Sequence, residues 1–91
     1  MKNKDESIRL FTAAIQIDNN YGAAYYNRGC VYCTLKKYDE AILDFDKVIE
    51  VDKTNIGAYY NRGIAFNSIH KYEDGKINIT NELLNFVNSL L

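Results

Sequence analysis

Apolar residues recur every three or four positions along most of this chain, and that spacing places them on one face of a helix. In the first such segment the apolar stripe is Ile8, Phe11 and Ile15. In the third it consists of Ala41, Ile42, Phe45, Val48 and Ile49. No stretch alternates between apolar and polar residues as a half-buried strand does, so the pattern predicts an all-α protein.

Short polar stretches separate the apolar segments. Two are rich in Asp and Asn, and two contain lysine, at 36–37 and 70–71. The chain has no proline, so these residues must form the turns. The predicted helices lie at about 4–17, 22–35, 38–51, 56–69 and, for most of its length, 72–91.

One unit is copied along the chain. The six residues Ala-Tyr-Tyr-Asn-Arg-Gly at 24–29 return unchanged at 58–63, which is 34 positions later. Phe11 and Phe45 keep the same offset upstream. A helix pair repeated at a fixed period is typical of a stacked array, in which each unit buries its apolar face against its neighbours. We expect one domain over 1–91, made of a half repeat at 4–21, a repeat at 22–55 and a divergent repeat at 56–91.

The two glycines of the repeated motif indicate close helix packing. Glycine inside a helix costs about 1 kcal/mol of stability relative to alanine, so tertiary packing at Gly29 and Gly63 must offset that cost. A turn centred at 36–37 sets Gly29 opposite Phe45, where a bare backbone leaves room for the ring. The same geometry brings Asp44 near Arg28 and within about a turn of Arg62. We therefore predict that Asp44 pairs with at least one of these arginines.

These residues resemble the tetratricopeptide repeat. The resemblance is carried by Tyr25, Arg28, Gly29, Tyr32, Ala41 and Phe45 within one period. It implies antiparallel helix hairpins stacked as a short right-handed α-solenoid of about two and a half repeats, with five helices. The chain departs from the family where Arg28 and Arg62 replace its usual leucine. It departs again in the last helix, where Gly75 and Ile79 replace a small residue and an aromatic one.

The resemblance also implies a function: a non-catalytic module whose concave groove binds a peptide or helix of a partner protein. Carried over by position, the groove residues are Ala23, Tyr26, Asn27, Cys30, Cys33, Thr34, Gly57, Tyr60, Asn61, Ile64, Asn67 and Ser68. The alternative for Tyr26 and Tyr60 is that they pack against neighbouring repeats. One subclass of the family clamps terminal carboxylates of chaperones. Asn27 matches its central Asn, but its basic pair falls on Gly57 and Asn61, so that activity is not expected.

Charge and composition exclude several other classes of function. The net charge is −1, with 11 basic and 12 acidic residues interspersed. The sequence therefore does not predict the basic surface that binding to nucleic acid phosphates requires. No apolar run is long enough for a membrane span or a signal peptide, so we expect a cytoplasmic protein. Cys30 and Cys33 form a C-x-x-C in mid-helix with one histidine in the whole chain, so a redox or zinc site is a weak alternative. We expect no enzyme, no cofactor and no metal.

The two ends of the array predict self-association. The first helix lacks the partner that normally precedes it, so part of its stripe should face water. The last helix has more apolar residues than one buried face can hold: Leu83, Leu84, Phe86, Val87, Leu90 and Leu91. Exposed apolar patches usually mark an interface. The alternatives are an end-to-end or helix-swapped oligomer, or a longer array that supplies the missing helices.

Overall fold

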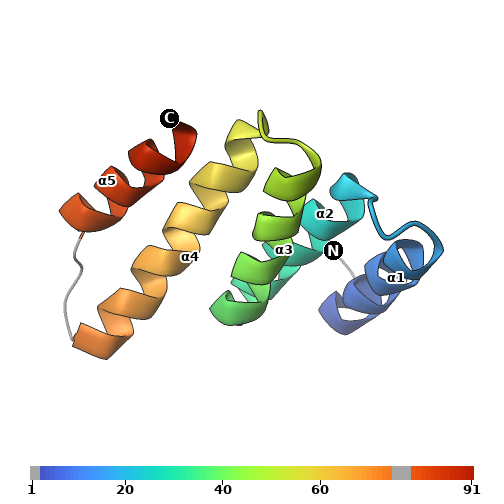
Figure 1. The fold of residues 1–91 in the computed structure, drawn as a ribbon. Helices are drawn as coiled ribbons and strands as arrows, with labels where there is room; N and C mark the ends of the chain where they lie inside the picture. The colour runs from blue at the N-terminus through green and yellow to red at the C-terminus, as the bar shows by residue number, and fades with distance from the viewer. Residues whose placement is uncertain (1–2, 75–78) are drawn as a thin grey trace.

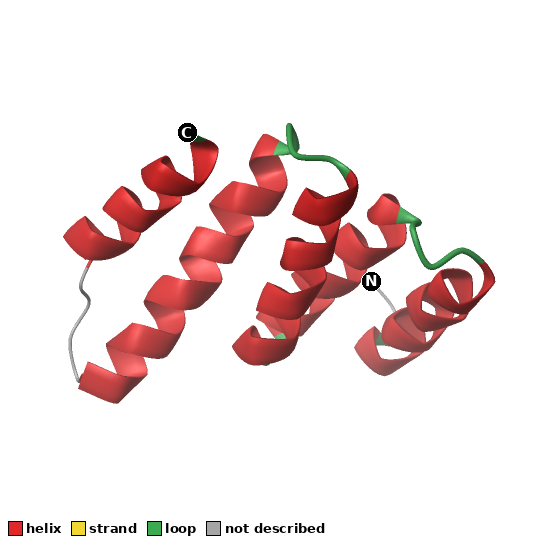
Figure 2. Ribbon diagram, in the orientation of Figure 1, coloured by secondary structure: helices red, strands yellow, loops and turns green. Residues whose placement is uncertain are grey.

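The computed structural model describes residues 3–74 and 79–91; the side chains of 71–74 and 79–84 are not described. In this part of the chain every regular element is a helix (Figure 2). The helices are α1 (Lys4–Ile17), α2 (Gly22–Thr34), α3 (Tyr38–Val51), α4 (Ile56–Asp74) and α5 (Ile79–Leu90). The expectation of an all-α fold is confirmed.

The helices stand in a row in chain order (Figure 1). Each packs against the helix before and after it, and α2 also touches α4 across the edge of α3. The result is an elongated body of 38 × 29 × 18 Å. This arrangement is that of a stacked repeat, in which contacts are made between sequence neighbours.

The polar breaks between helices are built as caps and turns. The Asn3 side chain accepts hydrogen bonds from two first-turn N–H groups of α1, and Asn55 Oδ1 accepts one from the Ala58 N–H of α4. Asp18 and Asp52 each accept from the N–H two residues later, both at 3.0 Å. The Asn3 and Asn55 contacts satisfy backbone donors that a helix start leaves without a partner. The two aspartate contacts stabilise the turns between helices.

The predicted turn at 70–71 is wrong, because α4 continues without interruption to Asp74. Its counterpart at the end of α2 depends on Lys36, which adopts a positive φ of 60°. There the Lys37 N–H donates to the Tyr32 carbonyl at 2.8 Å and closes the helix. A left-handed conformation costs a non-glycine residue about 1–2 kcal/mol, so packing of the next helix must offset it. At the position equivalent to Lys36 the chain has His70, and α4 continues through it.

The buried core lies in the middle of the row. Its centre is formed by Ala41, Phe45 and Val48 of α3 and Ala58 of α4, none of them more than 2% exposed. The Tyr26 ring of α2 meets Phe45 edge-on at 5.9 Å. By contrast, no residue of α1 is buried. The apolar free energy of folding is therefore concentrated where α2, α3 and α4 meet.

Gly29 has the role expected from the sequence. A Cβ added there would lie 2.9 Å from Phe45 Cε1, closer than real Cβ contacts come, and 3.2 Å from Asp44 Cβ, which is tighter than most. At Gly63 the nearest atom would be Phe86 Cδ2 at 3.3 Å. The α2–α3 pair is thus packed more tightly than the α4–α5 pair.

Candidate interaction groove

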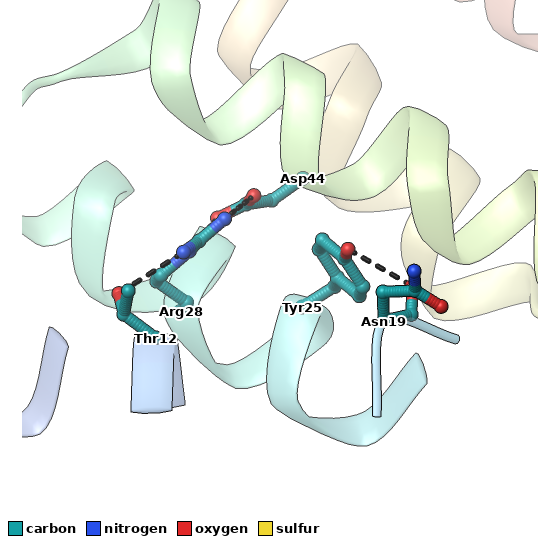
Figure 3. Close-up of polar contacts among 5 residues, drawn as sticks. All are labelled: Thr12, Asn19, Tyr25, Arg28 and Asp44. Atoms are coloured by element: carbon teal, nitrogen blue, oxygen red, sulfur yellow. Dashed lines mark hydrogen bonds and ion pairs between the residues drawn. The ribbon is translucent and has the colours of Figure 1, made fainter. Parts of the chain in front are cut away.

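One arginine ties three helices together and fixes the orientation of α2. Arg28 Nε and Nη2 donate to the two carboxylate oxygens of Asp44 on α3, at 2.9 and 2.7 Å (Figure 3). Its Nη1 donates to Thr12 Oγ1 on α1 at 3.0 Å. Asp44 is only 4% exposed, and the bidentate pair raises the pKa of Arg28 above its ordinary value. The predicted pairing of Asp44 is confirmed.

The second arginine of the repeated motif makes the equivalent backward contact. Arg62 Nη1 donates to Asp46 Oδ1 on α3 at 2.8 Å. Asp46 is 34 residues after Thr12, so both arginines reach the same position of the preceding helix. Arg62 lies over the Tyr59 ring, 5.3 Å from its centre, and Arg28 lies within 5.8 Å of two tyrosine rings. These arginines connect successive repeats and are not free to bind a ligand on the groove face.

Tyr25 completes the network on the same side of α2. Its hydroxyl donates to the Asn19 carbonyl in the turn before the helix, at 3.0 Å (Figure 3). The start of α2 has no side-chain cap, so this contact fixes the approach of the chain to the helix.

The groove residues implied by the family resemblance divide into two groups. Ala23, Asn27, Thr34, Tyr60 and Ile64 are exposed. The other members are partly buried: Tyr26, Cys30, Cys33, Gly57, Asn61, Asn67 and Ser68. The Asn67 Oδ1 atom is buried and accepts no hydrogen bond from any described residue. The exposed group is the part that a ligand can reach without rearrangement.

Tyr26 packs between repeats. Its hydroxyl accepts a hydrogen bond from Asn61 Nδ2 at 2.9 Å, and a Cβ on Gly57 would lie 2.7 Å from that hydroxyl. The same Asn61 nitrogen is 3.9 Å from Cys30 Sγ. Tyr60 differs, since it is 60% exposed and meets Phe86 edge-on at 6.3 Å. Tyr26 and Asn61 therefore form a rigid wall, while Tyr60 offers open contact area.

Two hollows adjoin this wall. The first has a volume of about 340 Å³. Its lining consists of Gly22, Ala23, Tyr26, Asn27, Val48, Asp52 and Asn55. The second has a volume of about 280 Å³, and its lining consists of Ser7, Phe11, Asn27, Cys30, Val31 and Thr34. Asn27 borders both.

Sequence reasoning missed part of the first hollow. Asp52 and Asn55 belong to the turn between α3 and α4, whereas the wall expected from the resemblance used only α2 and α4. The signal that could have found them is their position: a turn that joins two repeats lies beside the start of the preceding groove helix.

The two cysteines are not activated thiols. Both are free and partly buried. Burial raises the pKa of Cys30 and of Cys33, and the neighbouring thiol raises that of Cys33 further. A raised pKa lowers the thiolate fraction at neutral pH, which is the reverse of what redox catalysis requires. Within the described residues no three His, Cys, Asp or Glu side chains gather as a metal site would need.

Residues 22–55 match the family model of the tetratricopeptide repeat. The match spans α2, α3 and the turns after them. Over these residues the chain is similar to the tetratricopeptide repeat. The resemblance read from the sequence is confirmed, and repeats of this family generally serve as non-catalytic scaffolds for protein–protein interaction. A comparison with curated proteins found no match. Of the helices in the described part of the chain, none is long and apolar enough to cross a lipid bilayer.

Apolar side chains are exposed at both ends of the row. On α5 and after it, Val87, Leu90 and Leu91 are 46%, 45% and 98% exposed, while Phe86 is partly covered. Leu83 and Leu84 lie outside the described side chains. On α1, Leu10 is 59% and Ile17 is 89% exposed, whereas Ile8, Phe11 and Ile15 are partly covered.

Proposed function

We propose that this protein binds a peptide segment of a partner protein along the exposed face of α2, at its boundaries with α1 and α4. The observation that carries the proposal is the position of Asn27. Its side chain is exposed between two hollows, each large enough for a side chain of the ligand. A segment that crosses Asn27 could fill one hollow with each of two side chains.

The chemistry of this face suits a peptide backbone. The Asn27 amide offers two donors and one acceptor, which together can pair with a peptide C=O and N–H. Tyr26 beside it is held by Asn61 and Phe45, so this part of the wall loses little conformational freedom on binding. The hollow toward α1 adds the apolar side chains of Phe11 and Val31.

Selection from a random peptide library, followed by measurement of Kd for the selected peptides, tests the proposal. Asn27→Ala should weaken binding by about 2- to 10-fold, because a neutral hydrogen bond contributes about 0.5–1.5 kcal/mol. Asn88→Ala is the matched control, since Asn88 is an exposed helical Asn on α5. Equal binding by the two variants, or no selected peptide at all, would reject this face as the site.

Self-association is the second candidate function, and the exposed ends favour it. Phe11 on α1 is equivalent to Phe45 on α3, but Phe45 is fully buried under α2 whereas Phe11 borders the 280 Å³ hollow. The hollow beside Phe11 is therefore the equivalent, one repeat earlier, of the site on α3 that α2 occupies. A helix of a second copy could occupy that hollow.

Light scattering across a concentration series separates the two candidates. If the ends associate, the mass should rise with concentration, and Ile17→Lys and Leu90→Lys should return it to that of a monomer. Leu43→Lys is the control, because Leu43 is 68% exposed on the central helix α3. A monomeric mass for the unchanged chain at every concentration would reject self-association and leave peptide binding as the remaining candidate function.

A further inference from the structure

We infer that the hollow between the starts of α2 and α4 binds the side chain of a lysine or arginine in the partner peptide. The inference rests on the proposed peptide-binding function and specifies its ligand chemistry. The hollow is lined by Gly22, Ala23, Tyr26, Asn27, Val48, Asp52 and Asn55. Among these described residues Asp52 carries the one formal charge, and it is negative.

The carboxylate of Asp52 is held in place and stays ionised. Its Oδ1 accepts from the Thr54 N–H at 3.0 Å and from the Thr54 hydroxyl at 2.6 Å. These two hydrogen bonds lower the pKa of Asp52 below its ordinary value. Its second oxygen, Oδ2, has no hydrogen-bond donor among the residues that the structure describes, so it can accept from a ligand. A fixed acceptor loses less freedom on binding than a mobile surface carboxylate.

The other polar groups of the lining suit the neighbourhood of a cation. The hydroxyl oxygen of Tyr26 and the amide oxygens of Asn27 and Asn55 are acceptors, although Asn55 Oδ1 already caps α4. Val48 and Ala23 offer apolar contact to the methylene groups of a long basic side chain. The lining thus matches both the stem and the charged tip of lysine or arginine.

The start of α2 is the competing influence. A helix N-terminus carries a partial positive charge of about one half, and α2 has no side-chain cap to neutralise it. That end would favour an anion. The start of α4 adds a similar partial positive charge, and the end of α3, whose C-cap is Asp52, adds a partial negative charge. With the full negative charge of the Asp52 carboxylate the sum is negative, so the hollow favours a cation. A carbonyl group of the peptide backbone, which has no net charge, suits the uncapped N–H groups of α2.

Titration of the ¹⁵N-labelled chain with three small probes tests the inference. The probes are the Nα-acetyl N-methylamides of lysine, norleucine and glutamate, which share a backbone and differ in side-chain charge. The lysine probe should shift the amide signals of Gly22, Ala23 and Asn27. It should bind about two- to five-fold more tightly than the norleucine probe, the range expected for an exposed ion pair. Added salt should reduce the difference.

A matched pair of variants assigns the preference to one carboxylate. Asp52→Asn keeps an oxygen for the Thr54 contacts and should abolish the lysine preference. Asp18→Asn is the control, because Asp18 makes the same turn contact to Asn20 one repeat earlier. Equal binding of the lysine and norleucine probes, preference for the glutamate probe, or no signal shift with any probe would each overturn the inference.

The outcome also separates this inference from the proposed function. If selected peptides bind through Asn27 but show no enrichment of lysine or arginine and no response to Asp52→Asn, peptide binding stands and the inference fails. If the lysine probe binds at Asp52 while no library peptide is selected, the preference of the hollow for a basic side chain stands and the proposed peptide-binding function fails.

Discussion

Replacing Asp44 with asparagine should destabilise the fold strongly, because it removes the charge partner of a largely covered arginine. The side chains of Arg28 and Asp44 are 17% and 5% exposed. Breaking a buried ion pair by removing one partner costs about 3–5 kcal/mol. Arg28 keeps some contact with water and its bond to Thr12, so we expect a loss near the lower limit, about 3 kcal/mol. A domain of this size has a total free energy of unfolding of about 5–14 kcal/mol.

The net contribution of the Arg28–Asp44 ion pair to stability is much smaller than the loss caused by removing one of its partners. Arg28→Leu combined with Asp44→Leu removes both charges and fills the site with the residue that the family usually has before the glycine. Replacing a buried pair by apolar residues is often neutral or stabilising, so the double variant should lie within about 1 kcal/mol of the unchanged chain. The two single replacements should therefore be strongly non-additive.

Urea unfolding followed by circular dichroism measures these differences, provided the slope m is the same for all variants. The exposed pair of Arg62 and Asp46 is the internal control, because Asp46 is 48% exposed. Asp46→Asn should cost no more than about 1 kcal/mol. The reasoning fails if Asp44→Asn costs as little as Asp46→Asn, or if the double replacement costs as much as the sum of the single ones.

Three further predictions concern backbone and thiols. Gly29→Ala should destabilise the chain by about 1–3 kcal/mol through overpacking, whereas Gly63→Ala should be close to neutral, since its contact is looser and alanine favours the helix; equal losses in urea unfolding would contradict this. Lys36→Gly should stabilise by up to about 1 kcal/mol because it relieves a positive φ, while Lys37→Gly should not, and thermal melts would show the order. Burial raises the pKa of both thiols of α2, so their reaction with iodoacetamide at pH 8 should be slower than that of free cysteine and should accelerate in urea; a rate unchanged by urea would refute the stated cause.

The contacts between α2 and α3 could be predicted from the sequence because a short turn fixes the pairing of an antiparallel helix hairpin. From that turn, the approach of Gly29 to Phe45 and of Arg28 to Asp44 follows by counting residues, and both are observed. The bond from Arg28 to Thr12 was not predicted. It joins helices of different repeats, and a threonine gives no charge signal by which to find it.

The end of α4 could not be predicted because the equivalent turn, after α2, has no local signal in the sequence. Lys36 is not a glycine, so its positive φ is imposed by the packing of α3 on α2 and not by its own preference. At the equivalent place the chain has His70 and Lys71, and α4 continues through them. The Asp52 hollow was missed for a related reason: its lining combines a turn and two helices, and only the folded chain brings them together.

The concentration of the core in the middle of the row has a consequence for local opening. Amide hydrogens of α1, which has no buried residue, should exchange with solvent sooner than those of α3. Fraying of α1 would remove Phe11 from one hollow and leave the hollow at Asp52 intact, since none of its lining comes from α1. A ligand that fills both hollows would then slow exchange in α1, whereas one confined to the Asp52 hollow would leave it unchanged.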